Sequence, residues 1–167
     1  MTKIPAEEPN TRLWMRHTLA TLAYRAGKTL RGTPAAFGEY RASEQSPRVS
    51  EILAHMGDLM DWILTMMRGA PKWNNSKPLA WDAEIARFFT SLGAADAYLA
   101  SDQPIAWEPA KVFQGGIADA LTHTGQLAML RRLSGYKMKG ENYSRADIEV
   151  GRVGLEQVPP DPKVEFD

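Results

Sequence analysis

Apolar residues recur at helical spacing in four stretches of the chain, and the first runs from about residue 10 to Leu30. One face of this predicted helix carries Met15, Leu19, Leu22, Ala26 and Leu30. A second face carries Leu13, His17, Ala20, Tyr24 and Gly27. Because it is apolar around most of its circumference, we expect this helix to pack against several neighbours.

The other three stretches predict helices from Pro47 to about Arg68, from Pro78 to about Ser101, and from about Pro109 to Ser134. The buried stripe of the second helix is expected at Ile52, His55, Leu59, Trp62 and Met66. That of the third is expected at Trp81, Ile85, Phe88, Phe89, Leu92 and Leu99, and that of the fourth at Val112, Gly116, Leu127, Leu130 and Leu133. Glycine and proline mark residues 32–47 as a loop and residues 69–77 as a turn region.

Four long helices with short connections predict an all-α fold, a four-helix bundle over residues 10–135. Residues 1–9 form a polar lead-in with two prolines. Residues 136–167 are rich in glycine, proline and charge, which predicts an irregular C-terminal extension packed on the bundle or on a neighbouring subunit. A short helical turn is expected from Ser144, and no β-hairpin is predicted.

The composition narrows the possible functions. The 167 residues suffice for one domain with a sizeable core, and 20 acidic residues balance 20 basic ones. A net charge of zero gives no reason to expect nucleic acid or an anionic membrane as a partner. The lack of cysteine excludes disulfides, thiolate-bound zinc and a cysteine nucleophile. With no apolar run of about 20 residues and no apolar signal segment, a soluble cytoplasmic protein is expected.

Histidine and aspartate interrupt the apolar stripes at three points. Asp119 and His123 stand four residues apart, which places both on one face of the fourth helix, and His55 lies within the stripe of the second. Ionisable groups on a core-facing seam are costly unless they are paired or bound. Side chains that project inward from facing helices form metal sites in bundles, and two imidazoles with one carboxylate leave positions open for water or substrate. His55, Asp119 and His123 are therefore candidate metal ligands.

Each of these residues also has a simpler interpretation. A single core histidine is more often hydrogen-bonded than metal-bound, and Asp119 with His123 is also consistent with an i, i+4 charge pair. His17 and Gln126 are candidate cavity-lining or hydrogen-bonding groups beside the metal. Gly125 is expected to allow the close approach of a neighbouring helix.

Two segments resemble a known family. They are Glu-Ile-Leu-Ala-His-Met-Gly-Asp over residues 51–58 and Asp-Ala-Leu-Thr-His-Thr-Gly-Gln-Leu-Ala-Met-Leu-Arg-Arg-Leu-Ser-Gly over residues 119–135. Through them, residues 10–135 resemble the DinB/YfiT-like superfamily, whose members carry a histidine early in the second helix and an H-x-x-x-H-x-G-Q-type segment in the fourth. Asp119 stands where that segment has its first histidine, a change that keeps a metal ligand.

The resemblance implies a four-helix bundle with an up-up-down-down-like order of helices, and it implies a homodimer because many members are dimeric. It also implies a divalent metal near one end of the bundle, often nickel or zinc, and iron and manganese suit such ligands too. Activities known in the superfamily include thiol-dependent transferases and isomerases and some hydrolase-like proteins.

The leading hypothesis is therefore a metal-dependent transferase that acts on a small-molecule substrate with a low-molecular-weight thiol. The thiol has to be a cosubstrate because the chain has no cysteine. One alternative is a metal-dependent hydrolase, and another is a non-catalytic, stress-related metal-binding bundle. The sequence does not identify a general base.

Overall fold

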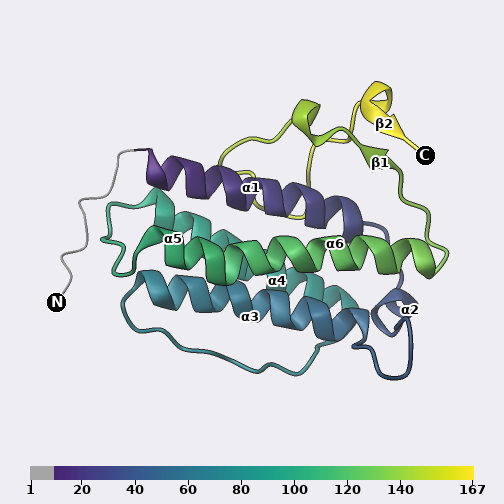
Figure 1. The fold of residues 1–167 in the computed structure, drawn as a ribbon, viewed down its shortest axis with the longest axis horizontal. Coiled ribbons are helices and arrows are strands. Elements are labelled where there is room, and N and C mark those ends of the chain that lie inside the picture. Colours follow the sequence, from purple (N-terminus) through teal and green to yellow (C-terminus); the bar gives the residue numbers. More distant parts are fainter. Residues whose placement is uncertain (1–9) are drawn as a thin grey trace.

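The computed structural model describes residues 10–167, and the polar lead-in expected over residues 1–9 lies outside them. The described chain is mostly helical, which confirms the all-α class. Its long helices are α1 (Thr11–Leu30), α3 (Val49–Met67), α4 (Trp81–Ala100) and α6 (Ala118–Leu133), which lie side by side in Figure 1. Helices α4 and α6 each pack against both α1 and α3. None of the helices in this part of the chain combines the length and the apolar character that crossing a membrane requires.

The order of helix directions differs from the expected up-up-down-down order. In Figure 1, α1 and α6 run in one direction and α3 and α4 run in the other, which is an up-down-down-up order. In agreement, Arg131 near the end of α6 donates to the carbonyl oxygens of Lys28 and Thr29 near the end of α1, at 3.1 and 2.6 Å. Because α3 and α4 are parallel, residues 68–80 run back along α3 instead of forming the short turn region that was predicted.

The predicted stripes supply most of the core. The first face of α1 and the whole stripe of α4 are buried, but the second face of α1 is only partly covered. Tyr24 is 2% exposed, whereas Leu13 is 55% exposed and His17 is exposed as well. The C-terminal segment packs on Tyr24 and Gly27 and leaves Leu13 and His17 uncovered. Leu133, also expected in the core, is 59% exposed because it is the last residue of α6.

Two segments have more local structure than the sequence pattern indicated. The loop expected over residues 32–47 contains a short helix, α2 (Ala35–Gly38), because Phe37 is fully buried and packs edge-on against Trp81, with 5.6 Å between ring centroids. The predicted fourth helix is not uniform either. It begins as α5 (Pro109–Val112) and passes through a π-helical turn, η1 (Phe113–Ile117), into α6.

Residues 136–167 lie over α1 (Figure 1) and contain the short helical turn that was expected, a 3-10 turn at Tyr143–Arg145. A second 3-10 turn spans Pro162–Val164. The unpredicted element is a small antiparallel ladder in which β1 (Gly140–Glu141) pairs with β2 (Glu165–Phe166). Strands of two residues are too short to show an alternating pattern, so sequence periodicity could not indicate them.

A buried charged group fixes this segment to α1. The Glu141 side chain is fully buried and accepts hydrogen bonds from the Tyr24 hydroxyl at 2.6 Å and from Lys28 Nζ at 2.7 Å. Lys28 also donates to Glu165 at 2.9 Å. Burial, together with the bond to Glu141, raises the pKa of Tyr24 well above its ordinary value. The C-terminal segment is therefore held by satisfied polar contacts in a place where an unpaired carboxylate would be costly.

Candidate metal centre

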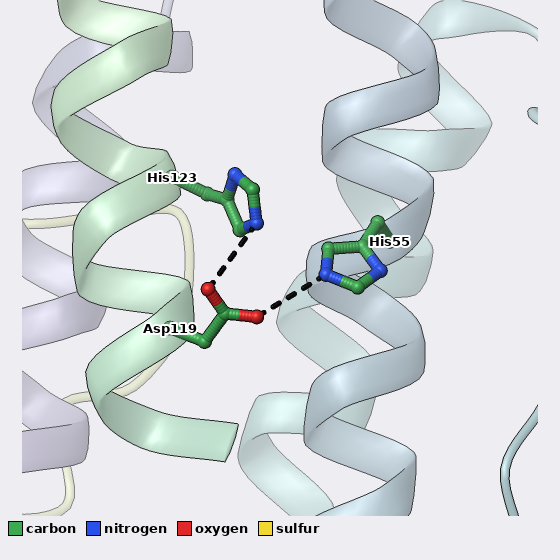
Figure 2. Close-up of side chains that lie close together, drawn as sticks. All are labelled: His55, Asp119 and His123. Carbon is green, nitrogen blue, oxygen red and sulfur yellow. Dashed lines mark hydrogen bonds and ion pairs between the residues drawn. The ribbon is translucent and has the colours of Figure 1, made fainter. Parts of the chain in front are cut away.

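Three side chains from two helices come together where α3 faces α6, as Figure 2 shows. Asp119 lies between the two histidines: its Oδ2 is 3.3 Å from His55 Nε2 and its Oδ1 is 3.4 Å from His123 Nε2. The two imidazole rings stand nearly perpendicular, with 4.9 Å between centroids. We call His55, Asp119 and His123 the ligand group. One nitrogen or oxygen atom from each residue can be chosen so that all three lie within 4.8 Å of one another.

The local geometry of the chain before α6 allows this convergence. Gly115 and Gly116 lie in the π-helical turn that precedes Asp119, and a side chain at either position would meet α3. A Cβ at Gly116 would overlap the Ile63 side chain and lie 3.3 Å from the Leu59 carbonyl oxygen. A Cβ at Gly115 would lie 3.3 Å from the Trp62 ring. The two glycines therefore let the backbone approach α3 closely, and π-helical turns of this kind are frequent at functional sites.

Gln126 determines the proton position on one of the two imidazoles. Its side-chain oxygen lies 2.7 Å from His123 Nδ1. An amide oxygen can only accept, so in the neutral ring His123 Nδ1 carries the proton and Nε2 has a lone pair. In that form Nε2 and the Asp119 carboxylate are two acceptors 3.4 Å apart, which a shared cation would satisfy. In the protonated ring Nε2 donates to Asp119, and the contact is an ordinary ion pair.

The distances within the ligand group suit a common divalent ion. Two atoms bound to one zinc ion at about 2.1 Å in a tetrahedral arrangement lie about 3.4 Å apart. The two histidine–aspartate separations, 3.3 and 3.4 Å, are close to this value, and they end on different oxygens of the Asp119 carboxylate. Neutral imidazole and carboxylate are ligands that zinc, nickel, iron and manganese accept. The described residues at this place therefore fit a divalent metal, and three protein ligands leave further coordination positions open.

The ligand group lies at the surface edge of the helix interface rather than in the core, where sequence analysis placed it. The side chains of His123, His55 and Asp119 are 20%, 37% and 42% exposed. Asp119 and His123 lie on the margin of the α6 face that packs on α3, so solvent reaches them from one side. As a plain exposed ion pair this arrangement would add only about 0–1 kcal/mol of stability, so it is not needed for folding.

An aromatic wall borders the ligand group on the side of the loop 68–80. The Trp73 ring packs on the His55 ring at 5.5 Å between centroids, and the Trp62 ring stands perpendicular to Trp73 at 5.8 Å. Ser76 fixes the same loop by donating from its backbone nitrogen and its hydroxyl to Asp58, at 2.8 and 2.7 Å. The loop therefore has an anchored position in which Trp73, itself 45% exposed, covers one side of the His55 ring.

A cavity of about 310 Å³ opens beside His55. It is polar, and its other lining residues are Glu51, Asp58, Asn75, Ser76, Lys77 and Pro78. Asp58 is not expected to bind a ligand, because it is buried and forms an ion pair with Arg87 at 3.0 Å. Lys77 adds a positive charge to the lining, and Glu51 adds a carboxylate that also accepts a hydrogen bond from the Arg48 backbone nitrogen at the start of α3, at 2.7 Å. This is a suitable place for the polar part of a small substrate.

Sequence reasoning missed the loop residues and misplaced two others. Trp73 and Lys77 lie in a segment without periodicity, and the one available signal was a tryptophan in an otherwise polar stretch. His17, expected beside the metal, is exposed on α1 and does not belong to the ligand group. Gly125 does not admit a neighbouring helix, because no described atom lies within 4 Å of a Cβ built there.

Comparison of the chain with protein-family models, with curated proteins and with solved structures found no match. The resemblance to the DinB/YfiT-like superfamily therefore stays a prediction from the segments around His55 and His123.

Proposed function

We propose that this protein is a divalent-metal-dependent enzyme built on a four-helix bundle of the DinB/YfiT-like kind. One observation carries the proposal: ligand atoms from two helices, 64 residues apart in sequence, lie within 4.8 Å of one another at an accessible edge. His55 Nε2, the Asp119 carboxylate and His123 Nε2 would hold the ion. Nickel, zinc, iron and manganese are all candidates for it. The resemblance that supports the bundle also makes a homodimer part of the proposal.

The metal would supply one kind of chemistry here: a coordinated thiol or water has a lowered pKa and is nucleophilic at neutral pH. The chain's own residues would do the rest. Gln126 would keep the His123 Nε2 lone pair directed at the ion by accepting a hydrogen bond from Nδ1–H. Trp62 and Trp73 would form an apolar wall on one side of the site. Lys77 and Glu51 would bind charged groups of a substrate in the adjoining cavity.

The favoured reaction is the transfer of a small-molecule thiol to an electrophilic substrate. Since the chain has no cysteine, the sulfur has to come from a cosubstrate. Hydrolysis of an ester or amide, with water as the nucleophile, is the second candidate. It is favoured by the lining of the cavity beside His55, where Lys77 is the one lysine or arginine among the described residues, so no cluster of basic side chains is present there to bind a thiol cosubstrate.

Metal binding is the first test. We expect metal-free protein to bind about one Zn²⁺ or Ni²⁺ per chain in calorimetric titration, and His55→Ala and Asp119→Asn to abolish this binding. His17→Ala is the matched control, because it removes an exposed imidazole outside the ligand group and should leave binding unchanged. Metal at about 100 times its Kd should raise the free energy of unfolding by about 2.7 kcal/mol in the parent protein and in His17→Ala only. Equal binding by the parent and His55→Ala would overturn the proposal.

Turnover assays then separate the activities. Metal-loaded protein is mixed with glutathione or cysteamine and chlorodinitrobenzene, and separately with p-nitrophenyl acetate without a thiol. Acceleration of the first reaction, lost in His55→Ala, supports the transferase. Acceleration of the second alone supports the hydrolase and removes the transferase. Metal binding with neither reaction above the rate of free metal would favour the non-catalytic bundle.

A further inference from the structure

A different cavity lies on the side of α6 that faces away from the ligand group. It has a volume of about 360 Å³ and lies between α1, α6 and the C-terminal segment. From α6 it is lined by Leu121, Thr124, Gly125 and Ala128. At 3.6 residues per turn, these positions point away from the face that carries Asp119 and His123. The volume is at the small end of the range for sites that bind small molecules.

Gly125 contributes open space to this cavity. A glycine within a helix costs about 1 kcal/mol relative to alanine, so its presence in α6 calls for a reason. Its φ is not positive, so the backbone conformation does not require glycine. No described atom lies within 4 Å of a Cβ built there, so close packing within the chain does not require it either. What glycine does provide at this position is empty volume above the helix.

The cavity wall contains a cation without an anionic partner. No hydrogen bond or ion pair joins the Arg25 side chain to another residue in the described part of the chain, and its Nε is buried without a hydrogen-bond partner there. The Arg25 guanidinium instead lies over the Tyr143 ring, 4.1 Å from the centroid. Glu141 lines the same cavity but is already bonded to Tyr24 and Lys28. Arg25 is only partly buried, so its guanidinium has donors that a ligand in the cavity can reach, and such a group is a typical partner for a carboxylate.

The remaining lining is largely apolar, with Leu121, Met138 and Phe166 among its members. Arg132 adds a second guanidinium at the rim, so the lining holds two cations and one carboxylate. We propose that this cavity binds a small monoanionic organic acid. The Arg25 guanidinium holds the carboxylate, and the apolar body of the acid lies against Leu121, Met138 and Phe166. This site is independent of the metal centre and goes beyond the proposed function.

The full chain is titrated with octanoate to test the site, and binding is measured by calorimetry and by ligand-observed NMR. We expect saturable binding of one octanoate per chain. Binding of 1-octanol, which lacks the negative charge, and of inorganic phosphate, which lacks the apolar body, should each be weaker by about tenfold or more. Gly125→Leu should abolish octanoate binding because its side chain fills the cavity. Gly125→Ala is the matched control and should retain binding. Arg25→Met should weaken binding about tenfold or more, whereas Arg145→Met, which removes an exposed arginine outside the cavity, should not.

Circular dichroism melts establish that each variant is folded before it is titrated. Octanoate binding that persists unchanged in folded Gly125→Leu, or that is equal for octanoate and 1-octanol, would overturn the inference. Titration of His55→Ala separates this site from the metal centre, because that variant should bind octanoate like the parent protein.

Discussion

The close approach of the π-helical turn to α3 makes Gly116→Ala a direct test of how the candidate metal centre is assembled. The Cβ of alanine would overlap the Ile63 side chain and press on the Leu59 carbonyl oxygen, which belongs to the helix backbone and cannot rotate away. The backbone before Asp119 must therefore move away from α3. Because Asp119 is three residues further along, the same movement should draw its carboxylate away from His55.

The magnitude follows from two opposing effects. Overpacking of a well-packed core costs about 1–3 kcal/mol, and an overlap with both a side chain and a backbone oxygen is expected to reach the upper end. Replacing a helical glycine by alanine recovers up to about 1 kcal/mol. We therefore expect Gly116→Ala to lower the free energy of unfolding by about 2 kcal/mol. Gly125→Ala, in the same helical segment but facing open space, should raise it by about 0.4–1 kcal/mol.

Urea unfolding of the metal-free proteins, followed by circular dichroism, gives both values, and calorimetric titration with Zn²⁺ gives the effect on the ligand group. Ile63→Ala alone should cost about 2–5 kcal/mol, because Ile63 is fully buried. In the Gly116→Ala background it should cost less than this and partly restore Zn²⁺ binding, because it removes the side chain that the new methyl group meets. If Gly116→Ala is as stable as Gly125→Ala and binds Zn²⁺ like the parent, the close approach does not assemble the site and the reasoning is refuted.

Three polar contacts give further predictions. Arg87→Met should destabilise the protein by about 3–5 kcal/mol, since it leaves the buried carboxylates of Asp58 and Glu84 without their cation, and urea unfolding measures this loss. Gln126→Leu should weaken Zn²⁺ binding about 10–100-fold in calorimetry while leaving the unfolding curve in place. The free energy of unfolding should fall as pH rises above about 10, because burial raises the pKa of Tyr24 and only the unfolded chain then loses the phenolic proton. Unfolding at stepped pH should give a shallower slope for Tyr24→Phe, and equal slopes would contradict this assignment.

The long helices were predictable because their core positions repeat with the helical period. The stripe of α4 from Trp81 to Leu99 is buried as expected. What periodicity could not indicate was which part of a mostly apolar helix a neighbour would cover. Leu13 is exposed and Tyr24 is buried on the same face of α1, because the C-terminal segment reaches only the latter. That segment is held by side-chain contacts between residues more than 100 positions apart, such as Tyr24 with Glu141.

The three candidate ligands were found because histidine and aspartate occupy positions where leucine or valine is typical. The surroundings could not be found in this way. Aspartate and arginine are typical of a solvated surface, yet Asp58 is only 2% exposed. Its carboxylate accepts hydrogen bonds from Ser76 and Arg87, which lie in other parts of the chain. The position of Trp73 against His55 depends on this anchor. Such contacts arise from the tertiary structure and leave no local pattern in the sequence.

The segment that connects the two parallel helices has a consequence for how this protein could evolve. Residues 68–80 form no helix or strand, yet Trp73 and Lys77 from this segment border the candidate centre. Exchanging a few side chains there would change the surroundings of the candidate centre while leaving the buried core cluster intact, since none of these residues belongs to it. Natural diversification and laboratory libraries could therefore vary this stretch, provided that the Ser76 anchor is kept.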